Sequence, residues 1–355
     1  MDITAILAQA IENDTSDMFI VAGLPLTFKI HGQQMRLEDQ GKLMPDTTQA
    51  LIMSLYELAR RDPAKIAAED ADDDFSFALR GIGRFRVNVF HQRSSLAAVV
   101  RVIKFGIPNY KEMGLPEEIM SLTKLNQGIV LVTGRAGSGK STTLACVLDA
   151  INHQRPGHIL TLEDPIEFIH NHDKCIVSQR EVFSDCKSYL SALRSALRES
   201  PDVILVGEMR DYETIDVAMK AAETGQLLFS SLHTPGAAST VDRIIDTFPA
   251  NQQAQVRLQL SMVLQAVISQ QLVPDVEGKL TPVFEMMFVN TAIRNLIRES
   301  KTHQIDAAIQ AGAAEGMRTM DTSLLQLYHA GRITRDTVLT YCLNYEATSR
   351  KLRVL

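Results

Sequence analysis

A short apolar run followed by a glycine-rich loop constrains this chain more than any other stretch. The run covers residues 129–132, and its β-branched and aliphatic side chains are typical of a buried parallel strand. Residues 134–141 then read GRAGSGKS, which fits the pattern G-x-x-x-x-G-K-[ST], and a helical pattern follows. A strand, this loop and a helix in that order are the context that a P-loop requires. The sequence therefore predicts a nucleotide site in an α/β domain.

The residue types of the loop explain how it would hold phosphate. Gly134, Gly137 and Gly139 allow backbone angles that other residues adopt only at a cost, so successive N–H groups can turn toward one anion. The helix that starts near Lys140 adds the positive end of its dipole. Lys140 would reach the β- and γ-phosphates of ATP, and the Ser141 hydroxyl would bind Mg²⁺. The predicted nucleotide-binding residues are Gly134, Ala136, Gly137, Ser138, Gly139, Lys140, Ser141 and Thr142.

Chance is the competing explanation for the loop. From average composition, the bare pattern occurs in roughly one chain in a hundred of this length. The strand before it and the helix after it make a coincidence rarer still. Nucleotide binding, however, establishes neither hydrolysis nor a cellular task.

The bulk composition narrows the class of protein. The chain has 355 residues, enough for two domains, and its 45% hydrophobic and 22% charged residues are ordinary for a globular protein. A net charge of −6 without a large basic tract gives no support for a nucleic-acid partner. The four cysteines form no C-x-x-C pair, which argues against zinc and against a disulfide scaffold. The N-terminal residues lack the basic start of a signal peptide, and no apolar run approaches the roughly 20 residues of a membrane span. We therefore expect a cytoplasmic protein that could dock on a membrane protein.

The first hundred residues predict a small α+β domain built on an antiparallel sheet. Apolar residues at helical spacing predict helices at 3–13 and 47–60. Alternating apolar residues predict strands at 17–21, 26–30, 75–79, 83–90 and 96–103. The acidic cluster at 69–74 is expected to be a solvated loop.

Arginines gather on or beside these strands. Arg84 and Arg86 share one face of their strand by period 2, opposite Phe85 and Val87. A solvated sheet face is the simple interpretation, and a cluster aimed at phosphates is the alternative. The pattern alone leaves both open. The arginines concerned are Arg80, Arg84, Arg86, Arg93 and Arg101.

The remainder of the chain alternates between strands and helices, as an open parallel sheet requires. Besides 129–132, strands are expected at 158–162, 203–206 and 227–232. Helices are expected at 140–152, 187–199, 212–224 and 251–273. Prolines and a glycine mark a linker before the P-loop. The predicted divisions are an N-terminal α+β domain at 1–106, a linker at 107–122, a P-loop domain at 123–290 and a mostly helical C-terminal region at 291–355.

Polar residues follow three of the predicted strands. Glu163, Glu208 and His233 each come at a strand's carboxyl end, where open α/β sheets bind their ligands. Phosphoryl transfer to water needs a held Mg²⁺ ion and an oriented water. Glu208, which ends the run VILVGE, would act on the Mg²⁺ shell through a water, and Glu163 would polarise the attacking water. His233 could sense the γ-phosphate. Each glutamate alone could equally be an exposed loop acid or a neighbour of a helix N-cap, and a lone histidine is usually structural.

Taken together, these motifs resemble those of a known family, the type II/IV secretion-system ATPases, over essentially the whole chain. GRAGSGKSTT resembles the family's Walker A motif, LEDPIEF its aspartate box, LRESPDVILVGEMRD its Walker B region and TGQLLFSSLHT its histidine box. The stretch AIRNLIRE at 292–299 resembles a C-terminal motif of the branch that retracts type IV pili, in contrast to the assembly ATPases.

The resemblance implies a fold and a set of roles. It implies a PAS-like N-terminal domain, a RecA-like ATPase domain and a homohexamer, with ATP bound between domains. Glu163 falls at the catalytic glutamate, Glu208 at the Walker B glutamate and His233 at the retained histidine of the histidine box. Arg86 and Arg101 fall where phosphate-contacting arginines are expected. An inner-membrane pilus platform protein is the implied partner, which would place the protein at the periphery of the cytoplasmic membrane, and a paralogous motor ATPase is a further candidate.

Departures from the family pattern also bear on function. Arg135 and Ala136 replace a usual Pro-Thr pair, at positions that contribute mainly backbone to the loop. Gln226 replaces the first histidine of the histidine box, so no role is assigned there. Within AIRNLIRE, Ile293, Leu296 and Ile297 would bury on one helix face. Arg294 and Arg298 would lie on the other face, which is either plain surface or an interaction surface that couples hydrolysis to retraction.

Three functions compete at this point. The favoured one is a hexameric motor ATPase that powers pilus retraction and twitching motility. The second is an assembly or secretion ATPase of the same superfamily. The third is a nucleotide-dependent accessory module that hydrolyses ATP weakly and partners another motor.

Overall fold

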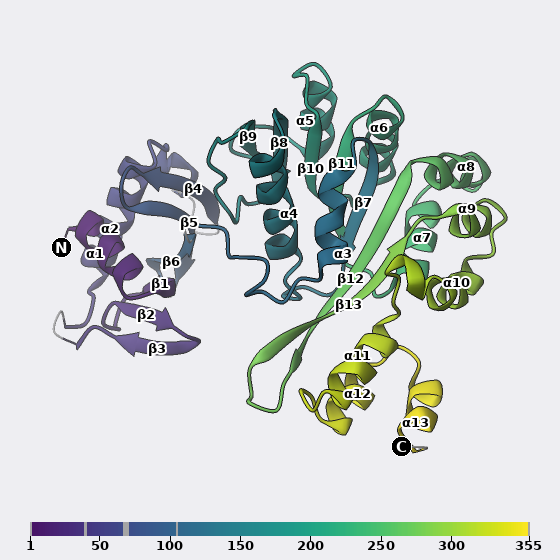
Figure 1. Cartoon of the computed structure of the whole chain (residues 1–355). Helices are drawn as coiled ribbons and strands as arrows, with labels where there is room; N and C mark the ends of the chain where they lie inside the picture. Colours follow the sequence, from purple (N-terminus) through teal and green to yellow (C-terminus); the bar gives the residue numbers. More distant parts are fainter. Residues whose placement is uncertain (1, 39–40, 67–70, 104–105, 354–355) are drawn as a thin grey trace. The chain divides into compact units, whose positions relative to one another are not determined.

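A computed structural model of the chain describes residues 2–38, 41–66, 71–103 and 106–353 (Figure 1). The chain divides into two compact units, which are described separately. The first comprises Met1–Gly106 with Glu167–Ile169, and the second comprises Ile107–Ile166 with His170–Leu355. Among the described residues, no helix is both long and apolar enough to cross a membrane.

The first unit is an antiparallel sheet with two helices packed on one face. In the described chain its strand order is β3-β2-β1-β6-β5-β4. Met18, Phe85 and Val100 point to the face that packs against the helices, and they belong to one buried cluster with Leu7 and Leu55. The elements are α1 (Ile3–Glu12), β1 (Thr15–Ile20), β2 (Thr27–Ile30), β3 (Gln33–Arg36), α2 (Pro45–Leu58), the short 3₁₀ helix η2 (Pro63–Ile66), β4 (Asp73–Leu79), β5 (Gly83–Gln92) and β6 (Ser95–Ile103).

The acidic cluster at 69–74 is only partly the solvated loop that the sequence predicts. Residues 69 and 70 lie outside the described chain, but Asp73 and Asp74 begin β4. Asp73 is buried, and its partners offset the cost of removing a carboxylate from water. Arg61 donates to both of its carboxylate oxygens, at 2.6 and 2.7 Å, and the Tyr56 hydroxyl donates at 3.1 Å. Charge composition could not distinguish these partnered carboxylates from solvated ones.

The second unit is a mixed sheet covered by helices on both faces. In the described residues its order is β13-β12-β7-β11-β10-β8-β9, with all neighbours parallel except β12 and β13. The elements are α3 (Glu117–Met120), η3 (Ser121–Lys124), β7 (Gly128–Thr133), α4 (Lys140–Gln154), β8 (Gly157–Glu163), β9 (Cys175–Glu181), α5 (Tyr189–Ala196), β10 (Val203–Glu208), α6 (Tyr212–Glu223), β11 (Leu227–Leu232), α7 (Ala237–Asp246), α8 (Gln253–Val263), β12 (Leu264–Pro274), β13 (Leu280–Phe288), α9 (Thr291–Arg298), η4 (Thr302–Gln304), α10 (Ile305–Ala311), η5 (Ala313–Glu315), α11 (Met320–His329), α12 (Arg335–Tyr341) and α13 (Tyr345–Arg353).

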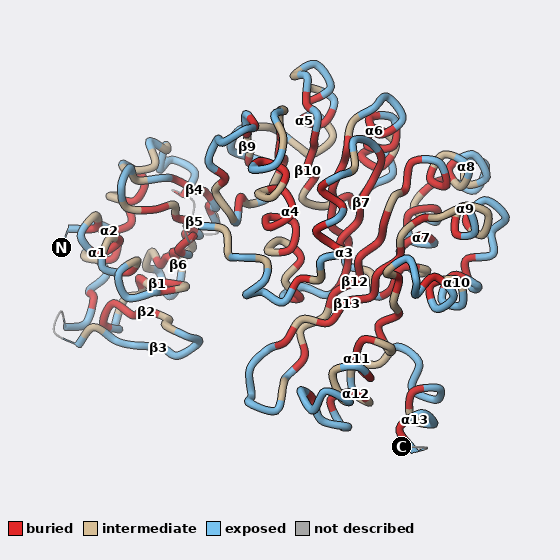
Figure 2. The backbone as a smooth tube through the Cα atoms, in the orientation of Figure 1, coloured by how far each residue is buried: buried red, intermediate tan, exposed pale blue. Residues whose placement is uncertain are grey.

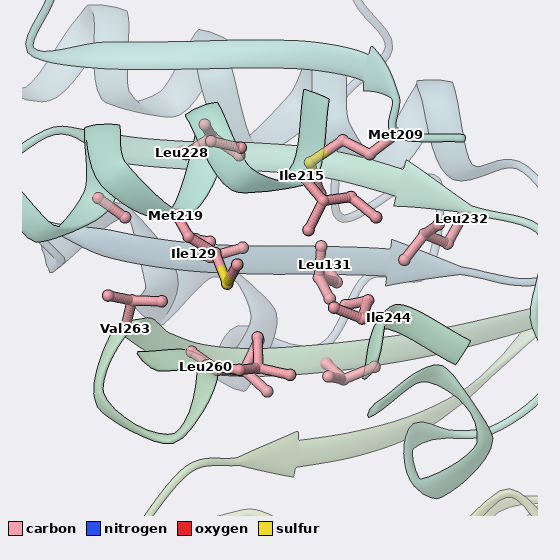
Figure 3. Close-up of a cluster of buried hydrophobic side chains, with 14 of the residues drawn as sticks. Ile129, Leu131, Met209, Ile215, Met219, Leu228, Leu232, Ile244, Leu260 and Val263 are labelled. Carbon is pink, nitrogen blue, oxygen red and sulfur yellow. The ribbon is translucent and has the colours of Figure 1, made fainter. Parts of the chain in front are cut away.

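The central strand β7 has both faces buried, which explains its continuous apolar run. Ile129 and Leu131 pack among residues of α6, α7 and α8, as Figure 3 shows. Val130 and Val132 pack on the opposite face against α4. Every residue of β7 is buried, and the strand is red along its length in Figure 2. The loop that follows β7 is therefore anchored to a strand that is buried along its whole length.

The long helix predicted at 251–273 is wrong. The helix α8 ends at Val263, and the next residues form β12, which lies between β7 and β13. Leu264 and Val267 pack on one face of the sheet, while Ala266 and Ile268 pack on the other. Because both faces are buried, the apolar residues do not alternate, and such a run cannot be told from a buried helix by periodicity.

Several other strands differ from the sequence prediction. The strands β3, β9 and β13 were not predicted, and β13 makes the sheet mixed where a fully parallel sheet was expected. The helix predicted at 187–199 is shorter and covers Tyr189–Ala196. The predicted α/β class, with a smaller α+β part before it, is confirmed, and the C-terminal residues are mainly helical as expected.

Candidate functional site: a phosphate loop beside a histidine and two carboxylates

The P-loop connects the enclosed strand β7 to the N-terminus of α4. Gly139 precedes the helix with φ of 89°, and Lys140 is the first helical residue. Gly134 needs glycine for two reasons: its φ is 140°, and a Cβ there would lie 2.2 Å from the Gln270 carbonyl oxygen of β12. The loop is thus pressed against β12, and it ends at the start of α4, where a helix N-terminus can meet an anion.

Lys140 is folded back into the loop. Its Nζ donates to the carbonyl oxygens of Gly134 and Arg135, at 2.9 and 3.0 Å, and its side chain is buried. The same Nζ lies 3.5 Å from Nδ1 of His233, at the carboxyl end of β11. Burial, followed by the nearby Lys140 charge, lowers the pKa of His233, while Glu208 opposes the shift. The imidazole is therefore neutral at pH 7.

Glu208 ends β10 on the other side of His233. Its Oε2 lies 3.7 Å from His233 Nε2, and its Oε1 lies 2.6 Å from an Arg210 guanidinium nitrogen. His233 thus stands between Lys140 and Glu208, so the structure brings together three of the predicted site residues. A cavity of about 310 Å³ adjoins them, lined by Glu208, Arg210 and His233 together with Arg243 of α7.

Glu163 ends β8, the strand next to β10. The Thr161 hydroxyl donates to its Oε1 at 2.6 Å, and the Gln179 amide donates to the same oxygen at 3.2 Å. These contacts fix the orientation of the carboxylate at the edge where β10 also ends.

Tyr189 of α5 lies close to both predicted carboxylates. Burial raises the pKa of its hydroxyl, and Asp164, Glu208 and Glu163 raise it further. A Cβ at Gly207 would come within 2.8 Å of the Tyr189 Oη, so a glycine is needed for the phenol to fit beside Glu208. The hydroxyl therefore stays protonated and can serve as a hydrogen-bond donor in this region.

The sequence prediction missed Tyr189, Arg210 and Gln270. Arg210 follows Glu208 by two residues in GEMRD, so its place at the strand end was available as a signal. Gln270 had none, because its segment was predicted to be helical; its Oε1 accepts from the Thr143 hydroxyl at 2.7 Å. It thereby ties the second turn of α4 to β12.

Arg86 and Arg101 belong to the first unit and are direct cross-strand neighbours. Arg86 donates to both oxygens of Asp74, at 2.6 and 3.0 Å, and Arg101 donates to Asp17 at 2.9 Å. Arg84 and Arg86 lie opposite the buried Phe85 and Val87, as the period-2 pattern predicts. Each of the two predicted phosphate ligands therefore has a carboxylate partner within its own unit.

The residues of the loop fit a bound nucleotide phosphate. Within the described chain, the Ser138 Oγ is buried without a hydrogen-bond partner, as a group awaiting an acceptor would be. Ala136 is exposed, in keeping with a mainly backbone role. Ser141 and Thr142 lie in the first turn of α4. Hydroxyl and carboxylate oxygens such as those of Ser141 and Glu208 are the donor types that suit Mg²⁺.

Comparisons with known proteins agree with the fold and with this set of motifs. The sequence profile described as type II/IV secretion system protein matches residues 1–335. The chain belongs to this family.

Relatives and solved structures within the family cover nearly the whole chain. It is 46% identical to the type IV pilus retraction ATPase PilT of Pseudomonas aeruginosa, over 95% of this chain and 96% of that protein. It is 43% identical to a twitching motility protein of Neisseria gonorrhoeae, over 96% and 90% of the two chains. A crystal structure of the pilus retraction motor PilT with bound ADP superposes with a TM-score of 0.91, at 45% identity and 99% coverage of both chains.

The stretch AIRNLIRE forms most of α9, and its two faces differ. Ile293 and Ile297 are fully buried in the main core, as predicted, while Leu296 is only partly buried against it. Arg294 is bound to a neighbouring helix and is not simply solvated. One of its nitrogens donates to the carbonyl oxygens of Ser261 and Met262, at 2.7 and 2.8 Å, in the last turn of α8. A guanidinium in that position stabilises a helix C-terminus. Arg298 is exposed, and its donor contact is to Asn295 on the same helix.

Proposed function

We propose that this chain is a motor ATPase that hydrolyses ATP to ADP and phosphate and uses the energy to retract type IV pili. The hydrolysis part is carried by one observation, the line of Lys140, His233 and Glu208 beside a P-loop whose buried Ser138 hydroxyl lacks a partner. Likeness to the two named relatives over almost the full chain supports the pilus part.

Each predicted residue has a role in this proposal. Lys140 exchanges its loop carbonyls for the β- and γ-phosphates, and the loop N–H groups bind the same phosphates. Ser141 and, through a water, Glu208 would hold Mg²⁺, which would neutralise charge on the phosphates. Glu163 orients the attacking water, and the neutral His233 donates or accepts a hydrogen bond near the γ-phosphate. Arg86 and Arg101 contact phosphate after leaving Asp74 and Asp17.

The proposal extends to the assembly and its setting. We assign the PAS-like domain to 1–106, the linker to 107–122, the RecA-like ATPase domain to 123–290 and the C-terminal helical region to 291–355. The active form is a homohexamer in the cytoplasm, docked on an inner-membrane pilus platform protein, and a paralogous motor ATPase is a second candidate partner. We include no nucleic-acid partner, because a net charge of −6 without a large basic tract gives no support for one.

The decisive test is a steady-state ATPase assay on the purified chain and on Glu163→Gln. The variant should bind ATP as the parent does, while its turnover falls by about 10²–10⁴-fold, because Gln cannot accept a proton from water. Parental turnover in the variant would disprove the role of Glu163. A parent that binds ATP without turnover would instead support a nucleotide-dependent accessory module.

A second test separates retraction from assembly or secretion. Deleting residues 292–299 would remove the buried Ile293 and Ile297, so a loss of motility would report only a damaged core. Arg298→Glu changes the exposed face of α9 without touching that core. Retraction is supported if this variant keeps ATPase activity but loses twitching in a complementation assay. Unchanged twitching counts against a retraction surface on α9.

A further inference from the structure

A buried carboxylate outside the proposed catalytic set joins two helices of the second unit. Glu285 lies on β13 with only 2% of its surface exposed. Its Oε1 accepts the Ala237 backbone N–H at 2.6 Å, and its Oε2 accepts the Met320 backbone N–H at 3.1 Å. Within the described residues it forms no ion pair with a basic side chain. One side chain thus receives the first N–H group of α7 and the first N–H group of α11.

Burying the Glu285 carboxylate costs free energy, so the hydrogen bonds that it accepts must offset that cost. Removing a carboxylate from water without a basic partner is unfavourable, and burial raises the pKa of Glu285. The two helix N-termini compensate with donated hydrogen bonds and the positive ends of their dipoles. An apolar side chain could fill the same volume, but it could not hold both helix starts in register.

The first helix start is the far end of the loop that carries His233. The four residues His233, Thr234, Pro235 and Gly236 connect β11 to α7. Gly236 donates its N–H to the Ser269 hydroxyl at 3.0 Å, and Ser269 is the cross-strand neighbour of Glu285. The loop is thereby fixed at one end by Ser269 and Glu285, and at the other end His233 faces Lys140.

The second helix start opens the C-terminal helical region. Glu285 holds the first residue of α11, and the Gln271 amide of β12 donates to the Tyr341 carbonyl of α12 at 3.3 Å. A cavity of about 210 Å³ is lined jointly by the P-loop at Arg135, the His233 loop at Pro235 and α12 at Tyr341. The C-terminal helices and both loops of the phosphate site therefore line one cavity.

We propose that Glu285 is a positioning residue that couples the loop at 233–236 to α11. The inference rests on the proposed function, since it needs nucleotide to bind at the P-loop. When Lys140 moves from the Gly134 and Arg135 carbonyls to a phosphate, the surroundings of His233 change. A movement of the loop at 233–236 then reaches the start of α11 through Glu285, because this carboxylate accepts hydrogen bonds from both Ala237 and Met320. Coupling of this kind is reciprocal, so displacing α11 alters nucleotide affinity as well.

Hydrogen–deuterium exchange of the full chain, with and without ATP and Mg²⁺, tests this directly. In the parent, nucleotide slows exchange in residues 134–143 and changes exchange in Met320–His329. Glu285→Gln has one acceptor oxygen where Glu has two, so one helix start loses its partner. The variant should keep the P-loop response and lose the α11 response.

A matched control comes from the same helix. The Ser323 hydroxyl donates to the Phe284 carbonyl at 2.5 Å and also joins α11 to β13, but it does not reach the His233 loop. Ser323→Ala should therefore keep both responses. If Glu285→Gln fails to fold, Ala237→Pro removes the N–H of the first residue of α7 at a helix position that accepts proline, and it should give the same loss.

The outcomes separate this inference from the proposed function. An α11 response in Glu285→Gln as large as in Ser323→Ala overturns the coupling role. A parent in which the P-loop responds and α11 does not overturns it as well, and leaves nucleotide binding standing. A parent without any P-loop response overturns the proposed function and the coupling with it.

Discussion

Two glycines of the P-loop differ in the space around them, and this difference allows a quantitative test. At Gly134, φ is 140°, and a Cβ would lie 2.2 Å from the Gln270 carbonyl oxygen and 2.8 Å from the Ser138 Oγ. At Gly137, φ is 75°, and a Cβ would meet nothing within 4 Å. Gly134→Ala and Gly137→Ala therefore add the same methyl group to one loop, with a clash in only one case.

The expected losses of stability follow from these distances. Ala in the left-handed region costs about 1–2 kcal/mol, which is the whole penalty expected at Gly137. At Gly134 a backbone penalty of about 1–3 kcal/mol is joined by overpacking of about 1–3 kcal/mol, because the opposing Gln270 oxygen belongs to the backbone of β12 and cannot rotate away. Gly134→Ala should thus be destabilised by about 2–6 kcal/mol.

Urea unfolding followed by far-UV circular dichroism measures the difference between the two variants. Gly134→Ala should unfold at clearly lower urea than Gly137→Ala, and a fluorescent ATP analogue should show that it also loses nucleotide binding. Equal midpoints for the two variants would refute the inference that the loop is pressed against β12. A Gly134→Ala variant as stable as the parent would refute the strained geometry at that residue.

Two further predictions concern the rest of the second unit. Burial lowers the pKa of His170 to about 4, so the unfolded chain binds its proton first as the pH falls, and stability is lost below about pH 6.5. Between about pH 7.5 and about pH 5.5 the parent should lose about 1 kcal/mol more than His170→Gln in urea unfolding, and identical pH slopes would show that His170 is not buried in its neutral form. Arg294→Ala should lower the free energy of unfolding by about 1.5–3 kcal/mol, because two carbonyls of α8 lose a charged donor. Arg298→Ala should change it by less than about 0.5 kcal/mol, and a comparable loss in both variants would contradict the helix-capping role of Arg294.

Strong local rules made much of this fold predictable. The glycine spacing of the P-loop, between an apolar strand and a helix, is specific enough to predict the β7–loop–α4 unit. The period-2 pattern predicted that Arg84 and Arg86 lie on one face of β5. Glu163, Glu208 and His233 were placed together by one topological argument, since parallel strands end at the same edge. In the structure, His233 lies close to both Lys140 and Glu208 at that edge.

Long-range pairing accounts for what the sequence could not reveal. The strand β12 is a strand because β7 and β13 lie on either side of it, and nothing within residues 264–274 encodes those neighbours. Gln270 lies in this segment, which was predicted to be helical, so its contact with Thr143 could not be predicted. Asp73 and Arg61 are twelve positions apart, and composition alone could not show that they form a buried pair. The roles of the catalytic residues remain predictions that the Glu163→Gln assay addresses.

The inward-folded Lys140 has a consequence for how tightly a ligand can bind. A free lysine side chain carries roughly 1.5–2 kcal/mol of rotamer entropy, which an arriving ligand would normally have to remove. Here the ammonium is already held by the Gly134 and Arg135 carbonyls, so folding has removed that freedom in advance. A nucleotide meets a preorganised cation that only changes partners. The resting protein is thus set to bind and release phosphate with little rearrangement, as a motor that cycles repeatedly requires.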